Sequence, residues 1–193
     1  MSKHFEKDFV KKCKKGDQKA LEQLYKETAD TLLGVCLRYT KNIQDAEDVF
    51  HEGFIKIIKN IKQLKDEKKL ISWMIRTMVN TAINYLKKNA KLAEDTFEDS
   101  YKYANTIDDI NQKDNVGPLL DLIYEEELYE LINKLPTGYK VVLNMYAIEG
   151  YSHKEIAKAL GISESTSKTQ YQKAKAKLKI MIEEKLGKKS QKD

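Results

Sequence analysis

The chain has 193 residues, of which 41% are hydrophobic and 34% charged, and its formal net charge is +5. These values are typical of a globular protein with one large domain or two small ones. Only two cysteines, two prolines and eight glycines are present, which excludes a disulfide framework and favours a mostly helical fold. No apolar run approaches the length of a membrane span, and the N-terminus lacks a signal-peptide core. We therefore expect a cytoplasmic protein without direct membrane insertion.

The residue types that carry catalysis or bind metals do not cluster along the chain. Cys13 and Cys36 are far apart and belong to no Cys-x-x-Cys pair, and the three histidines are scattered. Paired catalytic carboxylates, a Cys/His nucleophile set and a glycine-rich phosphate loop are all missing from the sequence. We therefore expect neither an enzyme nor a bound metal or cofactor.

Charge is unevenly distributed along the chain. Residues 54–93 contain ten basic and two acidic residues, a net +8, whereas residues 94–127 contain eleven acidic residues and two lysines, a net −9. Residues 163–193 contain nine lysines and four acidic residues, a net +5. Two basic blocks separated by an acidic one predict two modules that face nucleic acid, joined by a linker that avoids it.

Two amphipathic helices are predicted in the N-terminal half. In residues 18–40 an apolar stripe follows the three-four spacing of a helix: Leu21, Leu24, Thr28, Leu32, Val35 and Tyr39. After a break at Asn42, residues 45–61 carry a wide apolar face that includes Ile58, with Asp48 and Glu52 outside it. A basic loop from Lys62 to Lys69 follows.

The third predicted helix, residues 70–88, has two distinct faces. One is a narrow apolar stripe of Ile71, Ile75, Met78, Ala82 and Leu86. The opposite side carries Trp73, Arg76, Asn80, Asn84 and Lys87. Aromatic rings that stack on bases, amides that bond base edges and cations that bind phosphates are typical of a single-stranded DNA site. The same periodicity fits a tryptophan covered by another helix with its asparagines in solvent.

Residues 90–122 are acidic, rich in Asp, Asn and Thr, and show little periodicity, as expected of a linker. A second helical unit is predicted from Leu119 onwards, with a first helix that ends at Pro136. The next predicted helix packs beneath the last two and uses an apolar set of Val141, Val142, Met145 and Tyr146.

The stretch from Tyr151 to Lys179 predicts a helix, a tight turn and a second helix. Ser152 followed by Glu155 forms a capping box, Gly161 suits the position just past a helix end, and Ser163 can cap the second helix. Ile156, Ala157 and Leu160 form the apolar face of the first helix. Two helices joined in this way are typical of a DNA-reading helix-turn-helix.

The second helix of this pair is strongly basic, with five lysines and one acid between Ser163 and Ile180. Its predicted buried stripe consists of Tyr171, Ala174, Leu178 and Met181. The opposite side carries Ser165, Lys168, Thr169, Gln172 and Lys179. Small polar residues near a helix N-terminus can reach base edges, and lysines suit phosphates. A solvated basic helix at the end of a bundle is the alternative.

Taken together, these segments resemble the extracytoplasmic-function (ECF) sigma factors of the bacterial sigma-70 family, over roughly residues 5–92 and 122–184. The polymerase-docking region 2.2 of that family is similar to DAEDVFHEGFIKI, and its minus-ten region is similar to WMIRTMVNTAINYLKK. Region 4, which reads the minus-thirty-five element, is similar to LPTGYKVVLNMYAIEGYSHKEIAKALGISESTSKTQYQKAKAKL.

The resemblance implies an all-α fold with two small helical domains, a region 2 bundle and a region 4 helix-turn-helix, joined by an acidic linker. The expected boundaries are region 2 at 1–92, the linker at 93–121, region 4 at 122–186 and a basic tail at 187–193. Expected partners are promoter DNA, the RNA polymerase core through its β′ clamp helices and β flap, and an anti-sigma factor.

The resemblance also implies functional residues, carried over by position. The polymerase contact would use Asp48, His51 and Glu52. The melted minus-ten strand would be held by Trp73, Arg76, Asn80, Asn84, Lys87 and Lys88. The minus-thirty-five element would be read by Ser165, Thr166, Lys168, Thr169, Gln172 and Lys173.

This sequence departs from the family pattern at a few positions. His51 stands where the family usually has Gln, and Gln170-Tyr171 replaces a common Arg-Leu pair. Ser167 stands where many members have Val, on the buried side of the recognition helix. Lysine replaces most arginines and cannot copy the bidentate contact of arginine with guanine, which affects base preference. A conventional helix-turn-helix regulator with a helical sensing or dimerisation domain is the rival prediction. It would bind duplex DNA tightly without polymerase.

Overall fold

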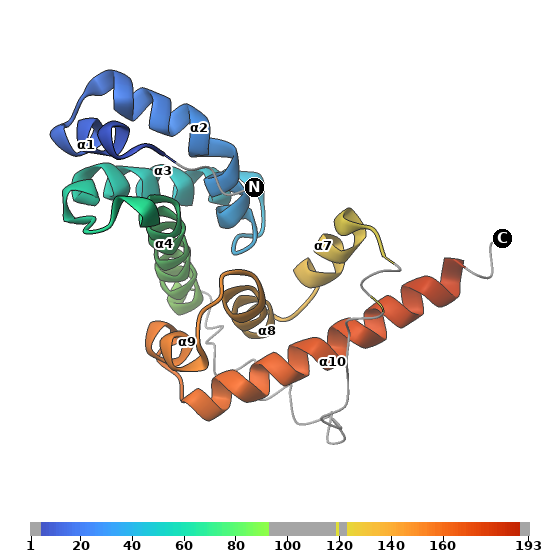
Figure 1. The fold of residues 1–193 in the computed structure, drawn as a ribbon. Helices are drawn as coiled ribbons and strands as arrows, with labels where there is room; N and C mark the ends of the chain where they lie inside the picture. Colours follow the sequence, from blue (N-terminus) through green and yellow to red (C-terminus); the bar gives the residue numbers. More distant parts are fainter. Residues whose placement is uncertain (1–4, 93–118, 120–122, 190–193) are drawn as a thin grey trace. The chain divides into compact units, whose positions relative to one another are not determined.

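The computed structural model describes residues 5–92, 119 and 123–189, and every regular element in those ranges is helical (Figure 1). This confirms the prediction of an all-α fold. The chain divides into two compact units, unit 1 from Met1 to Asn89 and unit 2 from Ala90 to Asp193. The predicted linker, 93–121, lies outside the described residues except for Leu119. None of the described helices has the length and apolar character needed to cross a membrane.

Unit 1 is built from four α-helices and two short 3-10 turns. Its elements are α1 (Lys7–Lys15), α2 (Gln18–Leu37), α3 (Ile43–Asn60), η1 (Ile61–Gln63), η2 (Glu67–Lys69) and α4 (Leu70–Leu92). Polar side chains fix the starts of two helices, since the amide of Ala20 donates to Asp17 and the amide of Asp45 donates to Asn42. Because Asn42 caps α3, this helix begins at Ile43, two residues before the predicted start. The helix α1 has no counterpart among the predicted helices.

The core of unit 1 lies where α2, α3 and α4 meet. Met78 of α4 is fully buried, and its sulfur lies 4.0 Å from the sulfur of Cys36 on α2. Met78 also lies directly against Gly53 of α3, the one place where this helix presents no side chain. A glycine in mid-helix therefore allows the close approach of α4.

The predicted apolar stripe of α4 is only partly correct. Met78 and Ala82 are buried, but Ile71, Ile75 and Leu86 are half-buried. The most buried residues also include Leu70 and Met74 near the start and Val79 and Ile83 farther along. The buried side of α4 changes along the helix, because the neighbouring helices cross it at a steep angle rather than run along it (Figure 1). The periodicity predicted one face and could not predict the direction of crossing.

Unit 2 contains α7 (Glu125–Asn133), α8 (Thr137–Leu143), a π-helical turn η4 (Asn144–Ile148), α9 (His153–Leu160) and α10 (Glu164–Lys189). The long α10 packs against α7, α8 and α9. It extends three residues into the predicted basic tail. A core cluster joins α7 and α8 to α10 through Leu131, Leu135, Tyr139, Leu143, Ala174, Leu178 and Ile182.

Two apolar predictions in unit 2 need correction. On α10, Tyr171 and Met181 of the predicted buried stripe are half-buried, whereas Gln170, which was not part of that stripe, is buried at 3% exposure. Ser167 is fully buried, on the side of the helix where it was predicted to lie. In η4, Tyr146 is 39% exposed rather than packed beneath the last two helices. The two tyrosines instead meet in an aromatic cluster, in which Tyr146 stacks on His153 and the Tyr171 ring is tilted against Tyr146 and lies edge-on to His153.

Candidate nucleic-acid interface

The helix-turn-helix is formed by α9 and α10, and its turn is fixed by local hydrogen bonds. Ser152 and Glu155 form the predicted capping box, in which the amide of Ser152 donates to Glu155 Oε2 at 2.9 Å. Gly161 closes α9 in the left-handed conformation at φ 77°, which an L-residue with a side chain adopts only at a cost. The amide of Thr166 donates to Ser163 Oγ at 2.9 Å and starts α10.

The first turns of α10 present a polar, basic surface. Ser165, Lys168, Thr169 and Gln172 are exposed, and Thr166 and Lys173 are half-buried. The six residues predicted for the minus-thirty-five element thus share the outward side of one helix. Lys168 Nζ lies 2.8 Å from Glu164 Oε1, and this contact lowers the pKa of the Glu164 carboxyl. Both side chains are about half exposed, so a phosphate can compete for Lys168 at little cost.

Behind this surface, a polar contact joins α9 to α10. His153 Nδ1 lies 2.9 Å from Ser167 Oγ, and the His153 ring stacks on Tyr146 with centroids 4.3 Å apart. Burial lowers the pKa of His153, the charge of Lys168 lowers it further, and Glu164 opposes the shift. The imidazole is therefore held neutral, which suits an aromatic stack beside a lysine-rich helix.

Sequence reasoning did not find His153. It did place Ser167 on the buried side of α10, where many family members carry Val. A buried hydroxyl needs a hydrogen-bond partner, and His153 on the facing helix was available. That requirement was the signal that could have identified the pair.

The polar side of α4 is also displayed on the surface. Arg76, Asn80, Asn84 and Lys88 are exposed, while Trp73 and Lys87 are half-buried. From Trp73 to Asn84 this side extends about 16 Å at 1.5 Å per residue, room for several stacked nucleotides. Trp73 is half-buried, so it is neither fully exposed nor completely covered within the described residues.

On α3, Asp48, His51 and Glu52 are all exposed. Glu52 Oε1 lies 2.6 Å from Lys56 Nζ in an ion pair within the helix. The same side of α3 carries two apolar residues, Ile55 at 52% exposure and Ile58 at 39%. The prediction that Ile58 joins the buried apolar face is wrong, because the core of unit 1 covers a narrower arc of α3.

Ile55 was missed as a candidate for this surface. At 100° per residue it projects between Asp48 and His51, opposite the buried arc. An exposed isoleucine flanked by acidic and polar residues is typical of a protein-binding surface rather than of a DNA-binding one.

The described residues contain no cluster of metal-binding side chains and no exposed cysteine. No group of three or more metal-binding side chains lies together in those parts of the chain. Both cysteines are buried, and burial raises the pKa of the Cys36 thiol to about 12 and also raises the pKa of Cys13. Neither thiol is therefore a nucleophile at neutral pH.

Comparison with known proteins matches both units to regions of one family. Sigma-70 region 2 matches residues 24–92, and Sigma-70 region 4 matches residues 125–178. The ECF RNA polymerase sigma-E factor of Haemophilus influenzae is 28% identical over 184 residues, which cover 92% of this chain and 93% of that protein. The ECF RNA polymerase sigma factor SigW of Bacillus subtilis is 27% identical over 180 residues, 90% of this chain and 94% of that protein.

Among solved structures, the fold is similar to that of the sigma factor RpoE from Bartonella quintana, determined in complex with the anti-sigma factor NepR. The TM-score is 0.52 and the sequence identity 14%, over 84% of this chain and 96% of that chain.

Proposed function

Because this chain belongs to the ECF group of the sigma-70 family, the initiating subunits of bacterial RNA polymerase, we propose that its two helical units divide promoter recognition between them. The chain is a sigma factor rather than an enzyme, and it binds the polymerase core and promoter DNA to initiate transcription. A conventional operator-binding regulator is set aside, because it would not carry regions 2 and 4 in this order.

In the proposed division, region 2 over residues 1–92 holds the melted minus-ten strand on α4. Trp73 stacks on a base, Asn80 and Asn84 bond base edges, and the cations Arg76, Lys87 and Lys88 neutralise phosphates. The exposed polar row on α4 is the observation that carries this proposal. Aromatic, amide and cationic side chains in one row are a combination that single-stranded nucleic acid requires.

Region 4 over residues 122–186 reads the minus-thirty-five element with α10 in the major groove. Ser165, Thr169 and Gln172 are exposed and reach base edges, while Lys168 and Lys173 bind phosphates. Thr166 lies at the start of α10, where its backbone amide donates to Ser163. Its side chain lies close to the DNA backbone in this arrangement. The joining segment 93–121 is acidic and is repelled by the same DNA.

The polymerase contact lies on α3. Asp48, His51 and Glu52 surround Ile55, so the surface combines an apolar centre with an acidic rim. Such a surface suits a helical partner with basic residues around an apolar contact, and we assign it to the β′ clamp helices. Region 4 contacts the β flap. An anti-sigma factor, as in the RpoE–NepR complex, would cover the surfaces needed for these contacts. The chain acts in the cytoplasm, with the polymerase.

The test is transcription in vitro with purified core polymerase on a template library with randomised minus-thirty-five and minus-ten elements. The protein should direct transcription from a defined subset of templates. Replacing Asp48 and Glu52 with lysine should abolish core binding, because both carboxylates are exposed and would attract basic residues of the partner, which lysines would repel. The same charge change at Glu22 and Asp30, exposed on α2, is the control and should leave core binding intact. Unchanged co-purification of the α3 variant with core would contradict the assignment.

A further inference from the structure

The first turns of α10, residues 164–173, are held in place mainly by polar contacts. The fully buried residues of this stretch are Ser167 and Gln170, at 0% and 3% exposure, and both are polar. The buried apolar residues of α10 begin only at Ala174, where the core cluster with α7 and α8 starts. Hydrogen bonds weaken steeply when their geometry changes, whereas apolar contacts have no preferred direction. The depth and rotation of these turns therefore depend on the hydrogen bonds that their buried side makes.

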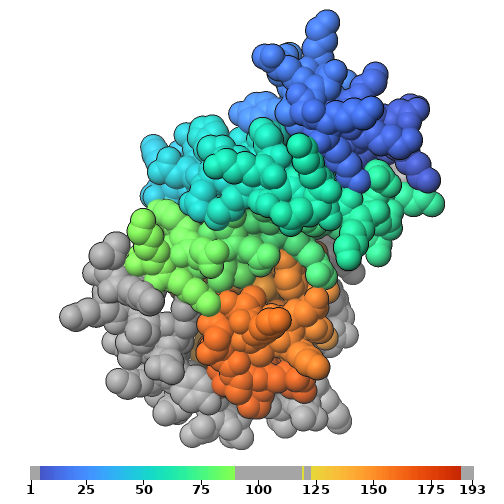
Figure 2. Space-filling model, turned by 90° about the vertical axis from the view of Figure 1, so that its left-hand side faces the viewer, coloured from blue at the N-terminus to red at the C-terminus, as the bar shows by residue number. Residues whose placement is uncertain are grey.

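Ser167 makes such a bond to the first residue of α9. His153 Nδ1 lies 2.9 Å from Ser167 Oγ, across 14 positions of sequence. In Figure 2, α9 and the first turns of α10 form one continuous orange surface, in agreement with the contacts between the two helices. The buried hydroxyl needs a hydrogen-bond partner once it has lost water, and the imidazole supplies it. This bond fixes the distance between the start of α9 and Ser167.

Two tyrosines hold the imidazole in the orientation that this bond requires. Tyr146 of η4 stacks on the His153 ring, with centroids 4.3 Å apart and an angle of 12° between the ring planes. Tyr171 of α10 lies edge-on to the same ring, with centroids 5.9 Å apart. Because both rings restrict the rotation of the imidazole, Nδ1 remains directed at Ser167. The cost of ordering this contact is therefore met before DNA binds.

Ser167 lies directly behind the side of α10 that is proposed to read bases. At 100° per residue, Ser165 and Thr169 project about 160° away from it, and Gln172 about 140°. All three side chains are exposed. A movement of Ser167 toward or away from α9 therefore moves the opposite side of the helix by the same distance. Hydrogen bonds to base edges have donor–acceptor distances of about 2.7–3.2 Å, so a shift of half an ångström is enough to lose one.

We propose that His153 is a positioning residue for base reading: through Ser167 it sets the depth at which the opposite side of α10 meets the major groove. This inference rests on the proposed reading of the minus-thirty-five element by α10. His153 touches no base in this arrangement and acts through the recognition helix. The proposal also gives the departure from the family at Ser167 a reason, because a valine there offers the imidazole no hydrogen-bond partner.

The experiment measures binding of duplex promoter fragments to holoenzyme reconstituted from core polymerase and full-length protein. One fragment carries the minus-thirty-five element selected from the template library, and the others carry single-base variants of that element. The readout is selectivity, the ratio of the affinity for the selected element to the affinity for a variant. For the wild type, one wrong base pair should lower affinity by about 5- to 150-fold.

Two variants remove the bond in different ways. His153→Phe keeps an aromatic ring against Tyr146 and deletes Nδ1, whereas Ser167→Ala deletes the hydroxyl. Each should lower selectivity by about threefold or more, and the double variant should lose no more than either single variant, because both act through one contact. His153→Asn places a polar group near the position of Nδ1 and should retain more selectivity than His153→Phe.

The matched control is Ile182→Val. Ile182 is fully buried in the core cluster farther along α10, away from α9, so the loss of one methyl group weakens the packing of unit 2 without changing the contact of His153. This control should keep the selectivity of the wild type even where its Tm falls. Circular dichroism and thermal unfolding are measured for every variant. Ser167→Ala carries the test should His153→Phe fail to fold.

Unchanged selectivity in His153→Phe and Ser167→Ala would overturn the proposal, as would losses that add up in the double variant. An equal loss in Ile182→Val would show a general effect of stability and overturn it as well. A wild-type holoenzyme that binds all minus-thirty-five variants alike would instead refute the proposed reading by α10, so the two failures are distinguishable.

Discussion

Substitution of Gly53 by alanine is the sharpest test of how unit 1 is packed. A Cβ at this position would overlap the sulfur of Met78, the residue that joins α2, α3 and α4. Met78 is fully buried, so it cannot move aside into solvent. Gly34 on α2 is a matched control, because a Cβ there meets nothing within 4 Å.

The expected magnitudes follow from two opposing terms. Replacing a mid-helix glycine by alanine stabilises a helix by about 0.5–1 kcal/mol, and Gly34→Ala should show this gain. Overpacking a well-filled core costs about 1–3 kcal/mol. Gly53→Ala should therefore lower the free energy of unfolding of unit 1 by up to about 2 kcal/mol. For a unit of this size, each kcal/mol changes the Tm by about 4–8 °C.

Urea unfolding followed by the fluorescence of Trp73 measures this effect, since it is the only tryptophan and lies in unit 1. A smaller partner should relieve the overlap, so Gly53→Ala with Met78→Val should be more stable than the sum of the two single changes predicts. If Gly53→Ala stabilises unit 1 as much as Gly34→Ala does, Met78 repacks freely and the argument from close approach is wrong.

Three further predictions concern the two proposed DNA-binding surfaces and the His153 contact that lies behind one of them. Trp73→Ala should weaken binding of a single-stranded minus-ten oligonucleotide by holoenzyme by about 1–3 kcal/mol for one lost base stack, with little change in Tm; a large fall in Tm with unchanged affinity would show a core role instead. Gln172→Ala should change base preference in the minus-thirty-five element by about 1–3 kcal/mol, whereas Lys173→Ala should weaken all sequences alike and flatten the salt slope by about one unit; uniform losses for both would refute base reading by Gln172. The pKa of His153 is lowered below its ordinary 6.5, so the unfolded chain binds this proton more readily, and the stability that the neutral ring contributes is present above pH 6.5 and lost below it. Thermal unfolding followed by circular dichroism should show a smaller loss between pH 7.5 and pH 5 for His153→Asn than for the wild type, and equal losses would contradict the shift.

The helix-turn-helix was the most predictable part of the fold, because its determinants are local. The capping box at Ser152, the left-handed Gly161 and the cap at Ser163 each act within four residues of the chain. A sequence pattern of this length predicts both helix ends and the turn between them. The start of α3 was missed by two residues for a related reason, since the capping role of Asn42 was not recognised.

Predictions that depend on tertiary contacts were less complete. Periodicity placed Ile58 in the apolar face of α3, but it cannot give the width of the arc that neighbouring helices cover. Periodicity also predicted one straight apolar stripe on α4. In the structure, the buried side of α4 changes between Leu70 and Ile83, because the neighbouring helices cross it. The contact of His153 with Ser167 and that of Lys14 with Glu67 link residues far apart in sequence, so neither pattern nor propensity indicates them.

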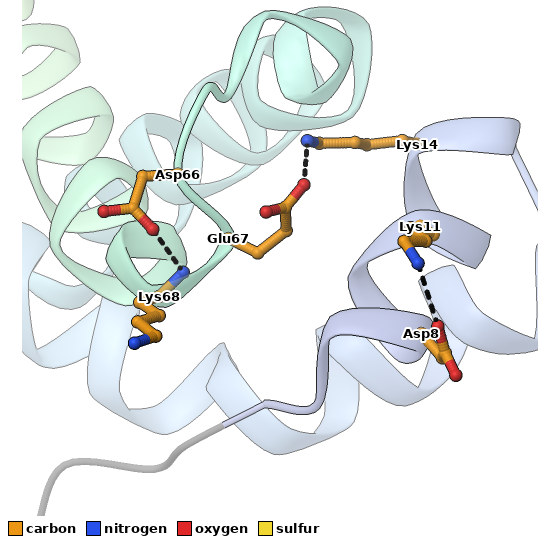
Figure 3. A network of polar contacts seen from close by, with 6 residues as sticks. All are labelled: Asp8, Lys11, Lys14, Asp66, Glu67 and Lys68. Carbon is orange, nitrogen blue, oxygen red and sulfur yellow. Dashed lines mark hydrogen bonds and ion pairs between the residues drawn. The ribbon is translucent and has the colours of Figure 1, made fainter.

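Charge shows most clearly why sequence counts and surfaces differ. Between Lys62 and Lys69 the formal sum is only +2, from four lysines and two acidic residues. The fold turns Glu67 toward Lys14 (Figure 3), which leaves its side chain only 23% exposed, whereas Asp66 bonds the amide of Lys68 and keeps a side chain that is 48% exposed. The charge that this turn between α3 and α4 displays therefore depends on the contact of Glu67 with Lys14 of α1, and the composition of the turn alone does not contain that information.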